Sequence, residues 1–161
     1  MELKRFAEKW CHEDYVPEPV KAAALTAVEK TLGINFPADY RTQVLAVGLP
    51  SPTLALLSAI VDLELDIRDL AYLATPSHMW EETLGSQAAG LPDNLLIIGY
   101  DCAGNSFCFD INDLSGIQKT GTPIYIWDHD FGDTEFVADS FAQWIEGYLG
   151  EWSKNLTAKD F

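Results

Sequence analysis

Apolar residues in the first fifty positions recur at intervals of three and four residues, the spacing that places them on one face of a helix. This spacing predicts three helices, over residues 2–10, about 20–32 and 37–47. Gly33 and Gly48 follow the second and third of these segments, at the position where glycine commonly ends a helix. The third helix would begin at a proline, which is favoured at a first helical position.

Residues 61–68 show a different period, in which apolar and charged residues alternate one by one. That alternation predicts a β-strand with one buried and one solvated face. The solvated face would carry the carboxylates of Asp62, Glu64 and Asp66. A helix is then predicted over about 75–85, because a threonine and a proline stand where its N-terminus would form.

Four apolar runs in the second half of the chain predict two β-hairpins. Leu95–Tyr100 and Ser106–Ile111 flank a turn that contains Gly104, a residue that tolerates positive φ. Ile124–Trp127 and Thr134–Val137 flank a second turn, which is rich in aspartate. The sequence therefore predicts an antiparallel sheet in this half.

The last predicted helix starts at Ser140, and Gln143 three residues later completes the pattern of a capping box. Apolar residues then continue at helical spacing from Phe141 to Trp152. Helices followed by hairpin-linked strands and a final helix predict an α+β fold, with a central antiparallel β-sheet flanked by N-terminal helices and a C-terminal amphipathic helix. With 161 residues, of which 48% are hydrophobic, we expect a single domain over 1–161.

Acidic residues outnumber basic residues by 25 to 10, which gives a formal net charge of −15. Most of the excess lies in residues 60–140, where fifteen acids accompany only two bases, Arg68 and Lys119. We do not expect such a chain to bind nucleic acid or an anionic membrane, because both need clustered Lys and Arg. The uneven distribution instead predicts a polarised surface that attracts a basic protein partner.

The N-terminus and the cysteines favour a cytoplasmic protein. Residues 1–10 mix charged and apolar side chains, unlike a signal peptide, and the apolar run Leu54–Val61 is too short to span a membrane. Three cysteines, Cys11, Cys102 and Cys108, form an odd and sparse set that suits a reducing compartment better than a disulfide framework.

Two groups of residues raise the question of catalysis. Asp128, His129 and Asp130 share one turn, and such residues ligate metals or exchange protons, so a small metal-assisted hydrolase is an alternative interpretation. Carboxylates in turns more commonly accept hydrogen bonds from their own backbone. Cys102 and Cys108 lie on opposite arms of the first hairpin and could face each other, but they lack further ligands at zinc spacing. We therefore expect no catalytic residue, no metal site and no cofactor.

Three blocks of the sequence resemble the SUKH superfamily of Smi/Knr-like proteins. The first is residues 28–40, a helix and short break followed by an apolar-Pro and acidic-Tyr opening. The second is the glycine- and aspartate-bearing hairpin over 95–110. The third is a Trp-Asp-His turn in 124–130 followed by an Asp-Ser-Phe helix start in 138–145. The segment 51–90 matches no pattern of that family.

The resemblance implies a SUKH-like domain with its motif-bearing core over about 20–152. In bacteria it implies a non-enzymatic immunity protein, which binds and neutralises a toxin domain of a polymorphic or contact-dependent toxin system. Eukaryotic relatives are associated with cell-wall regulation through protein contacts. A regulatory interaction scaffold without a toxin partner is therefore the alternative among binding proteins.

We expect the toxin, for example a nuclease, to present a basic surface to the acidic half of the chain. The candidate contact residues follow from charge and expected exposure, and the resemblance to the family does not supply them. They are Asp62, Glu64, Asp66, Asp101, Asp128, Asp130 and Asp133.

Overall fold

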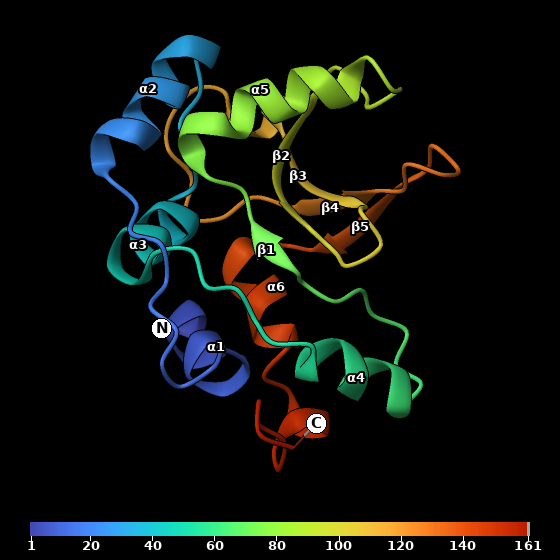
Figure 1. Cartoon of the computed structure of the whole chain (residues 1–161). Helices are drawn as coiled ribbons and strands as arrows, with labels where there is room; N and C mark the ends of the chain where they lie inside the picture. The colour runs from blue at the N-terminus through green and yellow to red at the C-terminus, as the bar shows by residue number, and fades with distance from the viewer. Residues whose placement is uncertain (161) are drawn as a thin grey trace.

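A five-stranded antiparallel sheet with the strand order β1-β2-β3-β4-β5 forms the centre of the computed structural model, which describes residues 1–160. Each strand pairs with the next one along the chain, so the sheet is a meander (Figure 1). The strands are β1 Tyr72–Leu73, β2 Leu95–Tyr100, β3 Ser106–Asp110, β4 Ile124–Trp127 and β5 Thr134–Ala138. The helices are α1 Glu2–Trp10, α2 Ala22–Leu32, α3 Ala38–Val47, α4 Ala55–Asp62, α5 Pro76–Gln87 and α6 Phe141–Gly147, with short 3₁₀ helices at Ile111–Leu114 and Glu151–Ser153.

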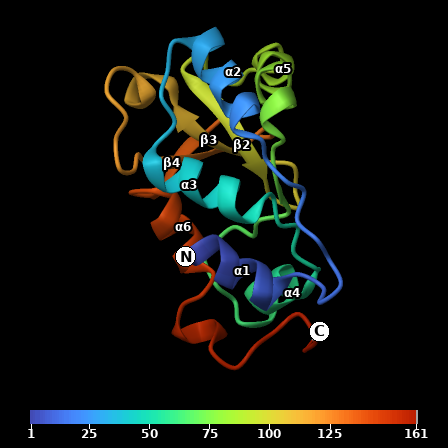
Figure 2. The ribbon, with the colours of Figure 1, turned by 90° about the vertical axis from the view of Figure 1, so that its left-hand side faces the viewer.

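The two faces of the sheet belong to different apolar clusters. On one face Phe107, Phe109 and Ile126 join the main core, which also contains the apolar stripes of α1, α3 and α6. The other face carries a smaller cluster that includes Cys108 and Trp127. Figure 2 shows α1, α3 and α6 together on one side of the molecule, with α2 and α5 packed side by side above them. The helices therefore cover the main-core face of the sheet, as expected for an α+β fold.

Most of the predicted elements are confirmed, and local chemistry explains their ends. Helix α1 spans the predicted residues, and α2 ends at Gly33, whose φ of 65° is left-handed. Ser140 caps α6 by accepting a hydrogen bond of 3.1 Å from the backbone N–H of Gln143. The Gln143 side chain in turn accepts from the N–H of Asp139 at 2.6 Å. Both hairpins lie where the apolar runs place them.

The predicted strand over 61–68 is wrong. Helix α4 continues to Asp62, and the chain then turns through Glu64, which has a φ of 52°. The apolar members of the alternation are not buried as a strand face would be: Val61 is 62% exposed and Ile67 is 41% exposed. The preceding residues bury one side of a helix instead, and the first strand of the sheet is the short β1 further on. Alternation in sequence therefore did not correspond to alternation in burial.

Two further features also differ from what the sequence suggested. Helix α6 ends at Gly147, so the C-terminal helix is shorter than predicted, although Trp152 still packs on Trp10 with ring centroids 6.0 Å apart. Cys102 and Cys108 do not face each other, because Cys108 is buried opposite Ile97 whereas Cys102 lies exposed in the turn.

Within residues 1–160, no helix combines the length and the apolar character needed to cross a bilayer.

Candidate protein-binding cleft

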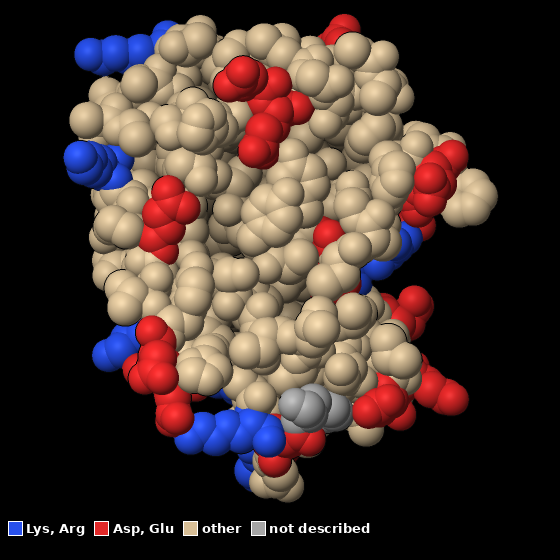
Figure 3. Space-filling view, viewed as in Figure 1, with Lys and Arg blue, Asp and Glu red and all other residues tan. Residues whose placement is uncertain are grey.

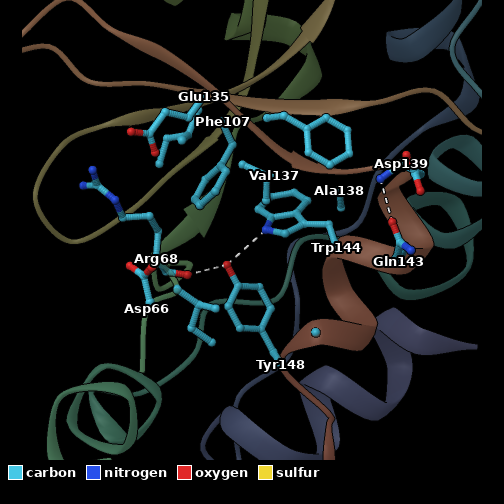
Figure 4. A pocket seen from close by; sticks show the side chains of 14 residues that line it. Asp66, Arg68, Phe107, Glu135, Val137, Ala138, Asp139, Gln143, Trp144 and Tyr148 are labelled. Carbon is cyan, nitrogen blue, oxygen red and sulfur yellow. Dashed lines mark hydrogen bonds between the residues drawn. The ribbon is translucent and has the colours of Figure 1, made fainter. Parts of the chain in front are cut away.

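A cleft of about 750 Å³ lies where the edge strand β5 meets α6 and the segment 66–68 that follows α4. We call it the β5–α6 cleft. Figure 4 shows strand β5 along one side, α6 along another and residues 66–68 opposite them. The cleft therefore brings residues 66–68 against the consecutive elements β5 and α6, which lie about 70 residues later in the chain. Its remaining lining comes from Phe107 and Ile126 of the neighbouring strands.

The floor of the cleft is fixed by a short hydrogen-bond chain. The indole N–H of Trp144 donates to the hydroxyl of Tyr148 at 3.0 Å, and that hydroxyl donates to the backbone carbonyl of Arg68 at 2.8 Å (Figure 4). Phe107 packs on Trp144 with ring centroids 4.5 Å apart. Burial raises the pKa of Tyr148 far above its usual range, so the hydroxyl keeps its proton. These contacts hold 66–68 against α6.

Strand β5 forms one wall and is hydrogen-bonded on one side only, to β4. Glu135 lies opposite Ile126, a residue of the main core, so its side chain projects on the cleft face of the sheet. Phe136 lies opposite Tyr125 on the other face and is 58% exposed. The outer edge of this strand is therefore open.

The rim of the cleft is acidic. Asp66, Glu135 and Asp139 all line it, and in the part of the chain that the structure describes none of the three forms an ion pair. The cation on the rim, Arg68, lies 3.6 Å from a carboxylate oxygen of Asp101 and 3.4 Å from one of Asp128. The positive charge of Arg68 is therefore already paired with these two carboxylates.

Arg68 also brings the two exposed groups of candidate contact residues together. It follows Asp62, Glu64 and Asp66 in the chain, all of which are exposed, and it binds Asp128 in the β4–β5 turn. Asp130 and Asp133 of that turn are exposed as well, whereas Asp128 is partly buried. Figure 1 shows the segment after α4 and the β4–β5 turn on the same side of the molecule.

The basic residues are distributed more unevenly over the surface than the acidic residues are. On the face drawn in Figure 3, Asp and Glu occur on the right, at the top and on the left. Lys and Arg lie along the left and lower edges, and one basic patch sits in a notch on the right. The side that carries the β4–β5 turn is therefore mostly acidic, but the acids do not form one continuous face.

Asp101 does not have the exposure expected of a contact residue, since it is only 4% exposed. Its carboxylate accepts hydrogen bonds from the N–H of Ala103 at 3.0 Å, the N–H of Asn105 at 2.8 Å and the side-chain amide of Asn105 at 3.0 Å. The tight β2–β3 turn directs these donors inward, and the carboxylate follows them. Asp101 therefore holds the turn in shape and offers little surface to a partner.

The turn that contains Asp128, His129 and Asp130 is organised by its own backbone. Asp128 accepts from the N–H of Phe131 at 3.1 Å and of Asp130 at 2.9 Å, and these bonds, followed by Arg68, lower its pKa. The Nδ1 atom of His129 lies 2.9 Å from the side-chain oxygen of Asn105. Among residues 1–160, no group of three or more His, Cys, Asp or Glu side chains is arranged to hold a metal ion.

Of the residues that line the cleft, the sequence reasoning identified only Asp66 as a contact residue, and those it missed include Arg68, Glu135, Phe136 and Asp139. Arg68 could have been identified from the sequence, because it is the only Lys or Arg between residues 42 and 118 and has carboxylates close to it in the chain. No feature of the sequence marks Glu135 and Phe136, because their role depends on β5 being the last strand of the sheet.

The meander sheet with helices over its main-core face defines a small α+β domain. The chain belongs to the SMI1 / KNR4 family (SUKH-1), whose family model matches residues 19–147. The match confirms the resemblance seen in the sequence and includes the segment 51–90, which had no recognisable pattern of its own. The comparison with curated proteins finds no match.

Proposed function

We propose that this protein is a non-enzymatic immunity protein that binds a toxin domain and neutralises it by covering its working surface. Membership in the SUKH-1 family is consistent with an immunity-type protein and supports this class of function. Cell-wall regulation or another scaffold role would use the same fold with a different partner.

The observation that carries the proposal is the convergence of carboxylates from two segments beside the β5–α6 cleft. Asp62, Glu64 and Asp66 lie in the segment that the Arg68–Asp128 ion pair of 3.4 Å joins to the β4–β5 turn. Their combined negative potential would attract a basic protein surface, such as the phosphate-binding groove of a nuclease. Attraction of this kind raises the association rate, while apolar contacts in the cleft would set the dissociation rate.

Co-expression tests the proposal directly. The toxin domain to use is the variable C-terminal domain of a large secreted protein encoded beside this chain. We expect co-expression to restore growth of cells that carry the toxin domain, and the purified proteins to form a complex. Growth arrest despite co-expression and the absence of a complex at low salt would overturn the proposal, as would turnover of a small substrate by this chain alone.

The salt dependence of the association rate tests the electrostatic part. A triple variant, Asp62→Asn, Glu64→Gln and Asp66→Asn, should associate more slowly and lose much of the salt dependence. The matched control, Asp14→Asn, Glu18→Gln and Asp93→Asn, removes the same charge from exposed positions outside the cleft. Equal effects of the two triples would assign the attraction to net charge and not to this surface.

A further inference from the structure

Strand β5 is the accessible edge of the sheet. The opposite edge, β1, is only two residues long, whereas β5 has five residues, Thr-Glu-Phe-Val-Ala. Soluble proteins usually protect such an edge with Pro, with Lys or with a covering segment, because unpaired backbone groups invite another strand. Strand β5 contains neither of these residues, and only a register shift beside Val137 interrupts it.

The register shows which backbone groups are free on this edge. Asp128 donates to the carbonyl of Asp133 at 2.8 Å, and hydrogen-bonded and non-hydrogen-bonded pairs alternate along an antiparallel ladder. The pair Ile126–Glu135 is therefore hydrogen-bonded, and the N–H and C=O groups of Thr134 and Phe136 point away from β4. These groups are placed to pair with an added strand.

The β5–α6 cleft lies beside this edge on the main-core face. Side chains of an added strand alternate between the two faces of the sheet, so every second one would enter the cleft. There it would meet Trp144 and Tyr148 on the floor and residues 66–68 on the far wall (Figure 4). A cleft of about 750 Å³ has the volume to hold such side chains.

The charge of the rim selects the chemistry of the occupant. Asp66, Glu135 and Asp139 are unpaired within residues 1–160, and Arg68 is already bound to Asp101 and Asp128. Lys or Arg side chains can pair with these carboxylates while their aliphatic stems lie on the aromatic floor. An acidic or neutral strand would leave the carboxylates without partners.

We propose that an extended, basic segment of a partner protein adds to β5 as a sixth antiparallel or parallel strand and places alternate Lys or Arg side chains in the β5–α6 cleft. The toxin domain is the natural source of this segment, and that part of the inference rests on the proposed function. The strand addition itself depends only on the open edge and the acidic cleft.

Isotope-labelled protein titrated with a synthetic heptapeptide of alternating Lys and Val tests the strand addition without a toxin. We expect amide shifts in residues 134–137 and 66–68 and slower hydrogen exchange at the amides of Thr134 and Phe136. A peptide that is N-methylated at alternate residues keeps the charges but loses backbone pairing, and it should bind about tenfold more weakly. Replacing Lys by Glu should abolish binding.

Protein variants separate the acidic rim from general electrostatics. The double variant Glu135→Gln and Asp139→Asn should weaken the Lys-Val peptide several-fold, and the control pair Asp14→Asn and Glu18→Gln should change it little. Equal binding of the N-methylated peptide, or shifts confined to other elements, would overturn the inference. A toxin complex that leaves the Thr134 and Phe136 amides unprotected would overturn it while leaving the proposed function intact.

Discussion

The hydroxyl of Tyr148 donates a hydrogen bond of 2.8 Å to the backbone carbonyl of Arg68, 80 residues earlier in the chain. The same hydroxyl accepts from the indole N–H of Trp144 at 3.0 Å. One buried side chain therefore ties α6 to the segment that carries Asp66 and Arg68, and this segment is the wall of the cleft opposite β5. The link therefore holds two walls of the cleft together.

Replacement of Tyr148 by Phe should remove that link. The variant Tyr148→Phe leaves the buried N–H of Trp144 without an acceptor, and we expect the free energy of unfolding to fall by about 2 kcal/mol in urea titrations. Tyr72→Phe is the matched control, because that side chain is 47% exposed, and its change should stay within about 0.5 kcal/mol. Similar losses in both variants would contradict the importance of the link.

Asp101→Ala should destabilise the protein through the β2–β3 turn. The substitution leaves the backbone and side-chain N–H groups of Asn105 unpaired in a buried site, and we expect a loss of about 2–4 kcal/mol in urea unfolding. Asp130→Ala removes an exposed aspartate from the nearby β4–β5 turn and should change stability by less than about 0.5 kcal/mol. If Asp101→Ala unfolds at the same urea concentration as the wild type, the structural role assigned to this carboxylate is wrong.

The elements that could be predicted from the sequence are those that local chemistry determines. Gly33 ends α2 in a left-handed conformation, and Ser140 with Gln143 starts α6, so both boundaries are encoded within a few residues. The segment 61–68 could not be predicted in this way. Its alternation was typical of a strand, but the core buries the helical face of the residues before it. Whether such a segment forms a helix or a strand depends on contacts with the rest of the core, and these contacts are not encoded in the segment itself.

The site was less predictable than the fold. The charge distribution predicted Asp66 and the β4–β5 turn as contact regions, and both lie on one side of the molecule. The charge distribution also predicted Asp101, but that carboxylate is buried because it accepts hydrogen bonds from the N–H groups of the tight β2–β3 turn. Glu135 and Asp139 enter the site because β5 ends the sheet and α6 folds back beside it. Neither fact is visible in the residues themselves.

Gly48→Ala should be much more damaging than Gly33→Ala. Gly48 has a φ of 88° and a ψ of −156°, a region that only glycine adopts readily, and an added Cβ would lie 2.5 Å from the carbonyl oxygen of Glu18. We expect a loss of about 2–4 kcal/mol, because the Glu18–Leu49 bridge must separate. Gly33 has open space around it and should lose only about 1 kcal/mol. Equal unfolding midpoints would refute the steric argument.

Cys102 should react slowly with thiol reagents although it is exposed. Local burial, followed by the carboxylates of Asp69 and Asp101, raises the pKa of its thiol to about 12. The reactive species is the thiolate, so at pH 8 we expect alkylation at least about tenfold slower than that of free cysteine, with the rate still rising above pH 10. Mass spectrometry of the alkylated protein measures this rate and separates Cys102 from the buried Cys11 and Cys108.

Asp69→Asn tests the cause of this low reactivity. The backbone N–H of Cys102 donates to a carboxylate oxygen of Asp69 at 3.1 Å, and the amide oxygen of the variant can still accept this bond although the side chain carries no charge. The pKa of the thiol should fall, and alkylation at pH 8 should become several-fold faster, because each unit of pKa changes the thiolate fraction about tenfold. Asp66→Asn removes the same charge from a residue that does not contribute to the thiol pKa, and should leave the rate unchanged. A rate that is the same in the Asp69 variant and in the wild type would show that the Asp69 carboxylate does not protect the thiol.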